Sequence, residues 1–138
     1  MLLRTKLVGQ GYIFENEPKV IAKTGWTCAD LLSNIEKSNI INDSYNMVSL
    51  LVGVNDQYRG YNINEYPSRF TAVLEKAIAF AGSKKKVIIL SIPDYSVTPF
   101  GGGSQVTAKA IADYNAINKR IAMEMGVKYV DITPISQK

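Results

Sequence analysis

Two short, almost uninterrupted apolar runs constrain the fold of this chain more than any other feature of its sequence. They occupy residues 47–53 (Met-Val-Ser-Leu-Leu-Val-Gly) and 87–92 (Val-Ile-Ile-Leu-Ser-Ile). Runs of this kind are typical of β-strands that are covered on both faces, as in a parallel sheet. Shorter runs of the same type at 19–23 and 127–132 bring the number of expected strands to four.

Segments with helical spacing separate these runs. Apolar residues recur at steps of three and four within 30–37, 65–81 and 105–125, and the last two segments are followed by Gly82 and Gly126, where glycine commonly ends a helix. Strands and helices therefore alternate along the chain with short connections. This order predicts an α/β fold, with a mainly parallel sheet as the middle of three α/β/α layers.

The chain fits a single domain. Its 138 residues lie within the roughly 100 to 200 residues that one domain usually contains, and no internal repeat is present. Residues 1–14 fit a short helix that Gly9 and Gly11 would end, and residues 93–104 form the longest irregular segment.

Charge and hydropathy exclude two classes of partner. The net charge of +4 is spread along the chain, and its one cluster, at residues 84–86, fits a solvated turn, so no nucleic-acid partner is expected. No stretch approaches the roughly 20 apolar residues of a membrane span, and the first residues lack the apolar run of a signal peptide. The chain as written is expected in the cytoplasm, whereas the location of any longer parent protein stays open.

The sequence contains no histidine and only one cysteine, Cys28. Histidine is the side chain whose pKa best suits proton transfer near neutral pH, so a Ser-His-Asp triad cannot be assembled from this chain alone. A single cysteine can form neither an internal disulfide nor a thiolate metal site. We therefore expect no metal and no cofactor.

Three loops follow successive apolar runs and carry the candidate site. They contain Gly25, Asn55 and Asp94, respectively. Because ligand sites in open parallel sheets form beyond the carboxyl ends of the strands, these three residues are expected at the same edge.

These loops resemble the sequence blocks of the SGNH or GDSL esterases and acylhydrolases. Residues 52–56 (Val-Gly-Val-Asn-Asp) match that family's Gly-x-Asn-Asp motif, and residues 23–27 (Lys-Thr-Gly-Trp-Thr) match its glycine block. Residues 92–95 (Ile-Pro-Asp-Tyr) follow the next strand in the same way, and the resemblance covers nearly all of 19–132. It implies the flavodoxin-like fold of the SGNH hydrolases.

The resemblance also implies roles for individual residues. The main-chain N–H of Gly25 and the side-chain amide of Asn55 would donate hydrogen bonds to the oxyanion of a tetrahedral intermediate. Uncharged donors fixed at strand ends suit this role, because they stabilise charge that appears only in the transition state. Asp56 would hold its loop together by accepting hydrogen bonds from nearby main-chain N–H groups.

Each of these residues also fits a purely structural interpretation. Gly25 would serve equally well as the residue with positive φ in a strand-to-helix turn. Asn55 and Asp56 could form only a turn, since both side chains bond readily to local backbone.

Four further residues are weaker candidates for contacting a substrate. Trp26 fits a packing residue or a pocket wall, Tyr58 and Arg59 fit either the rim of a site or a solvated loop, and Asp94 follows the third strand. Two other features favour structural roles. The glycines at 101–103 fit a flexible loop ahead of a helix capped by Ser104, rather than an anion-binding nest, and Cys28 fits a small packed residue.

Two blocks of the family are missing from the sequence: the Gly-Asp-Ser block with the nucleophile, and the Asp-x-x-His block with the acid and base. The single domain at 1–138 therefore resembles a truncated member that lacks the first strand and the C-terminal catalytic helix. In the family that strand lies between the strands matching 19–23 and 47–52. Residues 1–8, a second copy of the chain forming a homo-oligomer, or a longer gene product could fill the gap.

Two functions from different classes follow. The first is a serine hydrolase of carboxylic esters, acting on lysophospholipids, short acyl esters or acetylated sugars, which this chain alone would not complete. The second is a noncatalytic, degenerate or fragment domain that at most binds a small acyl or sugar ligand.

Overall fold

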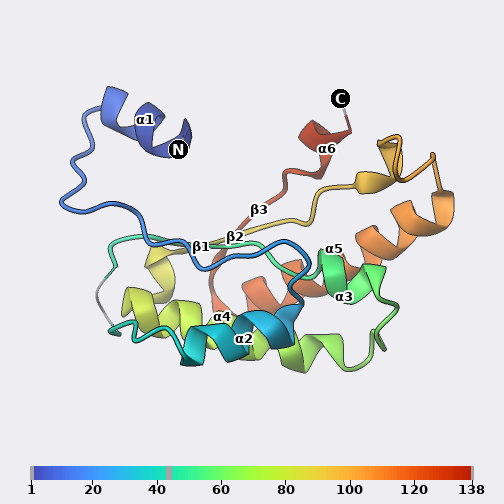
Figure 1. Cartoon of the computed structure of the whole chain (residues 1–138), viewed down its shortest axis with the longest axis horizontal. Helices are drawn as coiled ribbons and strands as arrows, with labels where there is room; N and C mark the ends of the chain where they lie inside the picture. The colour runs from blue at the N-terminus through green and yellow to red at the C-terminus, as the bar shows by residue number, and fades with distance from the viewer. Residues whose placement is uncertain (1, 43–44, 138) are drawn as a thin grey trace.

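A computed structural model describes residues 2–42 and 45–137 of the chain. Helices and short strands alternate along it (Figure 1). In chain order the elements are α1 (Leu2–Gly9), α2 (Cys28–Glu36), β1 (Val48–Leu50), α3 (Val54–Tyr58), α4 (Tyr66–Ala81), the 3-10 helix η1 (Lys84–Lys86), β2 (Val87–Leu90), the 3-10 helix η2 (Tyr95–Val97), α5 (Gln105–Met125), β3 (Lys128–Val130) and α6 (Thr133–Ser136).

The three strands form one parallel sheet in the order β1-β2-β3. The parallel arrangement that the apolar runs predict is therefore confirmed. One face carries Val87 and Ile89, which are fully buried, together with their neighbour Leu50. This face forms the centre of the hydrophobic core.

The two longest helices, α4 and α5, pack against the core and each ends at a glycine. In α4, Phe70, Val73 and Leu74 are completely buried. Gly82 and Gly126 end α4 and α5 with φ values of 65° and 69°, in the left-handed conformation that glycine adopts at little cost. The expected bounds of α5 and both glycine caps are thus confirmed.

Helices lie on both sides of the sheet. In Figure 1, α2, α4 and α5 lie on one side, and α1 and α6 lie on the other. The second face of the sheet is only partly covered, because Ile88 and Leu90 are half-buried while Ser49 and Lys128 are exposed. None of the helices in the described part is long and apolar enough to cross a membrane.

The fourth expected strand does not form. Residues 19–23 contain no assigned strand, and within the described residues no backbone hydrogen bond joins them to β1. A β-strand is stabilised by pairing with a neighbour, and here no strand lies between this segment and β1. Ile21 still packs against the core, but Val20 is 67% exposed. The outer edge of β1 is consequently open.

The N-terminal segment does not fill that edge. Its residues 2–9 form the helix α1, as the sequence predicts. Arg4 pairs with Glu17 at 3.0 Å and lies over the ring of Phe14, so this segment makes contacts within itself. Of the ways to complete the sheet, a strand formed by these residues is therefore excluded; Met1 lies outside the described residues.

Candidate functional site

The loops that carry Gly25 and Asn55 meet at the carboxyl end of the sheet. The side-chain amide of Asn55 donates to the main-chain carbonyl of Trp26 at 2.8 Å, and the guanidinium of Arg59 donates to the carbonyl of Gly25 at 2.6 Å. Gly25 has a φ of +86°, which favours glycine. Within the described residues its N–H makes no hydrogen bond. The bonds from Asn55 and Arg59 bring the two expected donors into one small region.

Gly53 sets the direction in which α3 leaves the sheet. It precedes this helix with a φ of +116°, and a Cβ atom at this position would lie 2.1 Å from the hydroxyl oxygen of Tyr66 and 3.0 Å from Cδ1 of Ile92. Only glycine fits between these two side chains. The close approach places Asn55 on the first turn of α3, facing the loop at Trp26.

Asp56 joins the start of α3 to the start of α2. Its side chain is fully buried, and Oδ2 accepts a hydrogen bond from the main-chain N–H of Cys28 at 2.9 Å. Burial raises the pKa of the Asp56 carboxyl, and the hydrogen bond from Cys28 offsets part of that effect. The expected role of Asp56 as a loop anchor therefore fits, although its partner is the first residue of α2 and not a residue of its own loop. Burial also raises the pKa of the Cys28 thiol, which disfavours the nucleophilic thiolate.

The glycine-bearing loop is held by a capping box. The Thr27 N–H donates to Oδ2 of Asp30 at 3.0 Å, and the Asp30 N–H donates to the Thr27 hydroxyl at 3.3 Å. The hydrogen bond from the Thr27 N–H lowers the pKa of the Asp30 carboxyl. The guanidinium of Arg59, the residue after α3, lies 3.7 Å from the same carboxylate, so this side chain contacts both ends of the short loop.

The other four candidates lie in different surroundings. Trp26 is half-buried and packs against the core, and Tyr58 is 60% exposed on α3. Arg59 is exposed and bonds to Gly25, as described above. Asp94 is only 4% exposed and accepts hydrogen bonds from the Ser96 N–H at 2.9 Å and from the Gln137 amide at 2.8 Å. The first bond lies within the segment after β2, and the second joins the Asp94 carboxylate to the residue that follows α6.

Two asparagines on α5 were missed by sequence reasoning. Asn115 bonds to both main-chain groups of Ile92, accepting from its N–H at 2.7 Å and donating to its carbonyl at 2.9 Å, and so fixes the end of β2. Asn118 is fully buried beside Tyr114 and Ile121. The sequence does mark Asn118, because this polar residue interrupts the apolar stripe of α5. A polar side chain buried at such a position needs a hydrogen-bond partner.

The chemistry of the assembled region is that of hydrogen-bond donation. No group of three or more histidine, cysteine, aspartate or glutamate side chains in the described residues could hold a metal ion. The region instead offers the main-chain N–H of Gly25 and the Asn55 amide, which has a second hydrogen besides the one it donates to Trp26.

Comparison with known proteins gives one result. No curated protein matches the chain. The family model of the GDSL-like lipases and acylhydrolases matches residues 4–138, which is almost the whole sequence. This match spans the two loops that Asn55 and Arg59 connect. The chain therefore belongs to the GDSL-like lipase/acylhydrolase family.

Proposed function

We propose that this chain supplies the oxyanion-binding part of the active site of a carboxylic ester hydrolase. The main-chain N–H of Gly25 and the side-chain amide of Asn55 donate to the oxygen of the tetrahedral intermediate. The observation that carries the proposal is the hydrogen bond of 2.8 Å between the Asn55 amide and the Trp26 carbonyl, which fixes the amide beside the Gly25 loop before any substrate binds. Donors fixed in advance are effective because they need no reorganisation during the reaction.

The nucleophile and the base come from outside these 138 residues. The sequence has no histidine to serve as the general base, and no Gly-Asp-Ser block to carry the nucleophile. The open outer edge of β1 lies next to the Gly53 turn, so a strand added there would end beside Asn55. A further segment or a second subunit could provide that strand.

A noncatalytic role is the second candidate. The observation that favours it is the same lack of histidine, because a site with donors and no base binds ligands without turning them over. In that case the region around Asn55 would hold a small acyl or sugar ligand.

Hydrolysis of p-nitrophenyl acetate separates the two candidates. The chain alone should be no faster than a histidine-free control protein. A version carrying an added Gly-Asp-Ser strand and an added Asp-x-x-His helix should be faster by orders of magnitude, and Asn55→Ala should then lower kcat by about 10²- to 10³-fold.

Asn34→Ala is the matched control for this experiment. Asn34 also donates its amide to a main-chain carbonyl, that of Asp30 at 2.8 Å, but lies within α2. It should leave kcat of the completed enzyme nearly unchanged. Equal losses in the two variants, or labelling of a serine of the unmodified chain by a fluorophosphonate, would show that the site is wrongly placed.

A further inference from the structure

A cluster of polar side chains lies inside the core, where α3, α4 and α5 meet. Its members are Asp56 from α3, Tyr66 and Arg69 from α4, and Tyr114 and Asn118 from α5. We call these five side chains the internal polar cluster. Asp56, Tyr66 and Asn118 are completely buried, and Tyr114 is buried as well. The proposed oxyanion site uses none of them as a donor.

Direct contacts bring the members of the cluster together. The rings of Tyr66 and Tyr114 lie 4.4 Å apart between their centroids, which joins α4 to α5. The Tyr114 hydroxyl donates to the Tyr61 carbonyl at 3.2 Å, and the guanidinium carbon of Arg69 lies 5.3 Å from the centroid of the Tyr61 ring. Asn118 follows Tyr114 by four residues, and side chains at this spacing lie on one face of a helix.

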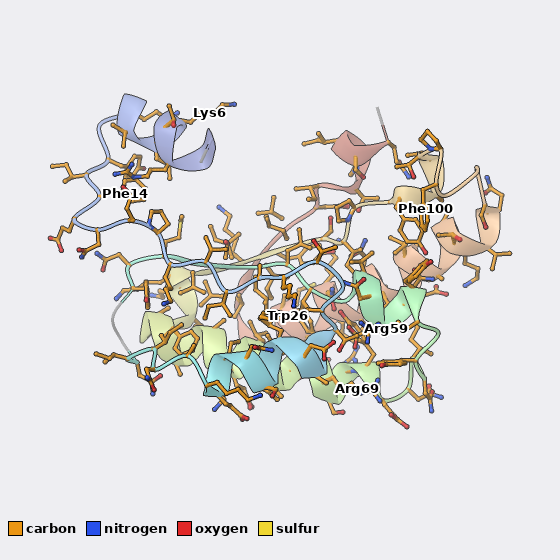
Figure 2. The ribbon with its side chains drawn as sticks, viewed as in Figure 1. Lys6, Phe14, Trp26, Arg59, Arg69 and Phe100 are labelled. Carbon is orange, nitrogen blue, oxygen red and sulfur yellow. The ribbon has the colours of Figure 1, made fainter. Side chains whose placement is uncertain are left out.

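The cluster members also act on one another electrostatically. Burial raises the pKa of the Asp56 carboxyl, whereas hydrogen bonding and the positive charge of Arg69 offset part of this effect. Burial likewise raises the pKa of the Tyr66 hydroxyl, and the Asn118 amide beside it offsets part of that rise. Figure 2 shows Arg69 at the same end of the molecule as Arg59, the residue that follows α3.

Four buried polar atoms of the cluster have no hydrogen-bond partner among the described residues. They are Oδ1 of Asp56, Nη1 of Arg69, and both the oxygen and the nitrogen of the Asn118 amide. The two oxygens need donors, and the two nitrogens need acceptors. Native proteins leave few buried polar groups without a partner, because each one lowers the stability of the fold. Four such atoms in one cluster therefore point to a ligand.

The charges of the cluster select the chemistry of that ligand. A cation would satisfy the two oxygens but would be repelled by Arg69, and an anion would be repelled by Asp56. A neutral molecule that both donates and accepts satisfies all four atoms. Water has this property, and a buried water molecule typically makes about three hydrogen bonds to groups that lack other partners.

We propose that the internal polar cluster encloses ordered water. The water donates to Oδ1 of Asp56 and to the Asn118 oxygen, and it accepts from Nη1 of Arg69 and from the Asn118 nitrogen. It thereby joins α3 to α4 and α5, and it steadies the helix that carries Asn55. The inference goes beyond the ester hydrolase function and does not depend on it.

Cross-relaxation between water and amide hydrogens in NMR spectra tests the inference on the unmodified chain. The side-chain amide hydrogens of Asn118 should show a cross-peak to water with the sign of a long-lived contact. Tyr66→Phe should keep this cross-peak, because it removes a neighbouring hydroxyl hydrogen and leaves the water in place. The Asn34 amide, which donates to the Asp30 carbonyl on α2, is the control and should show no long-lived contact.

Oxygen-17 relaxation dispersion counts the enclosed water molecules. Asn118→Leu has a similar volume but no polar atoms in its side chain, so it should lose the contribution of at least one long-lived water molecule. It should also lower the urea midpoint of unfolding, because Oδ1 of Asp56 then loses a partner. Asn34→Leu is the matched control and should keep the full dispersion.

Four results would overturn the proposal. The first is an Asn118 amide without a long-lived water contact, and the second is loss of that contact in Tyr66→Phe, which would assign the cross-peak to the hydroxyl. The third is unchanged dispersion in Asn118→Leu. The fourth is a higher urea midpoint in this variant, because leucine stabilises only where it removes two unsatisfied atoms. If Asn118→Leu does not fold, the first two results still decide.

Discussion

The side chain of Asn55 and the main chain of Trp26 are joined by a hydrogen bond that spans 29 residues of sequence. It connects the helix after β1 to the loop before α2, and so holds together the two donors of the proposed oxyanion site. The contact forms only when α3 and the loop before α2 are both in their folded positions. The arrangement of the site therefore depends on the packing of α2 and α3 at the end of the sheet.

Replacing Asn55 should loosen this junction. Asn55→Ala leaves the Trp26 carbonyl unpaired and should lower the free energy of unfolding in urea by about 1 kcal/mol. Asn55→Asp should cost more, because a carboxylate oxygen then faces the carbonyl oxygen. In NMR spectra both variants should shift the Gly25 amide, whereas Asn34→Ala should not. An Asn55→Asp variant as stable as the unaltered chain would contradict the hydrogen bond.

Gly53→Ala should be far more destabilising than Gly102→Ala. At Gly53 the Cβ would meet the Tyr66 hydroxyl at 2.1 Å, whereas at Gly102, with a φ of +59°, no atom lies within 4 Å. We expect a loss of at least about 3 kcal/mol for the first variant and about 1 kcal/mol for the second. Thermal and urea unfolding would measure both.

Tyr66→Phe tests the cause of that loss. In the Gly53→Ala background it removes the oxygen atom that the new Cβ would meet, so it should restore part of the lost stability. Equal losses for the two glycine variants, or no recovery with Tyr66→Phe, would mean that steric overlap at Gly53 is not the cause.

Acid should destabilise the loop around Asp94. Hydrogen bonding to Ser96, with a further contribution from Gln137, lowers the pKa of the Asp94 carboxyl below its ordinary value of 3.8. The ionised form therefore stabilises the folded state at pH values above 3.8, and this contribution disappears as the pH falls through the lower, folded-state pKa. Asp94→Asn should lower stability at neutral pH and show a smaller further loss on acidification.

The matched control for Asp94 is Asp113→Asn on α5. Asp113 is paired with Lys109 at 2.7 Å on the exposed surface of that helix, where ion pairs contribute little. Unfolding midpoints at several pH values would be compared. If the two variants have the same pH profile, the Asp94 carboxylate does not stabilise its loop.

The open edge of β1 should make the chain associate or leave it weakly stable. Sedimentation at increasing concentration should show dimers or larger species, and Met47→Lys, next to β1, should reduce them because an edge charge disfavours strand pairing. Met47 is 44% exposed; Met123→Lys on α5, at a site that is 71% exposed, is the control. A monomer at all concentrations that melts at about 45 to 65 °C, as mesophile domains do, would refute this.

The helices α1, α2, α4 and α5 were predictable because their signals are local, whereas the short helices α3 and α6 were not predicted. The apolar spacing of α5, the Ser104 cap before it and the Gly126 cap after it all lie within one stretch of chain, and the structure has this helix at the predicted bounds. The strands β1, β2 and β3 were predictable in the same way from their apolar runs. The Gly-x-Asn-Asp block also identified the family correctly.

The sequence alone thus determined where the helices α1, α2, α4 and α5 and the strands β1, β2 and β3 lie, and which family the chain belongs to. Only the tertiary structure decided that residues 19–23 stay unpaired, because a strand depends on a neighbour that its own sequence cannot supply. It likewise decided that Asn55 bonds to Trp26 and that Phe100 lies against Tyr58. These contacts join residues distant in sequence, and packing of the whole core sets which distant groups come within bonding distance.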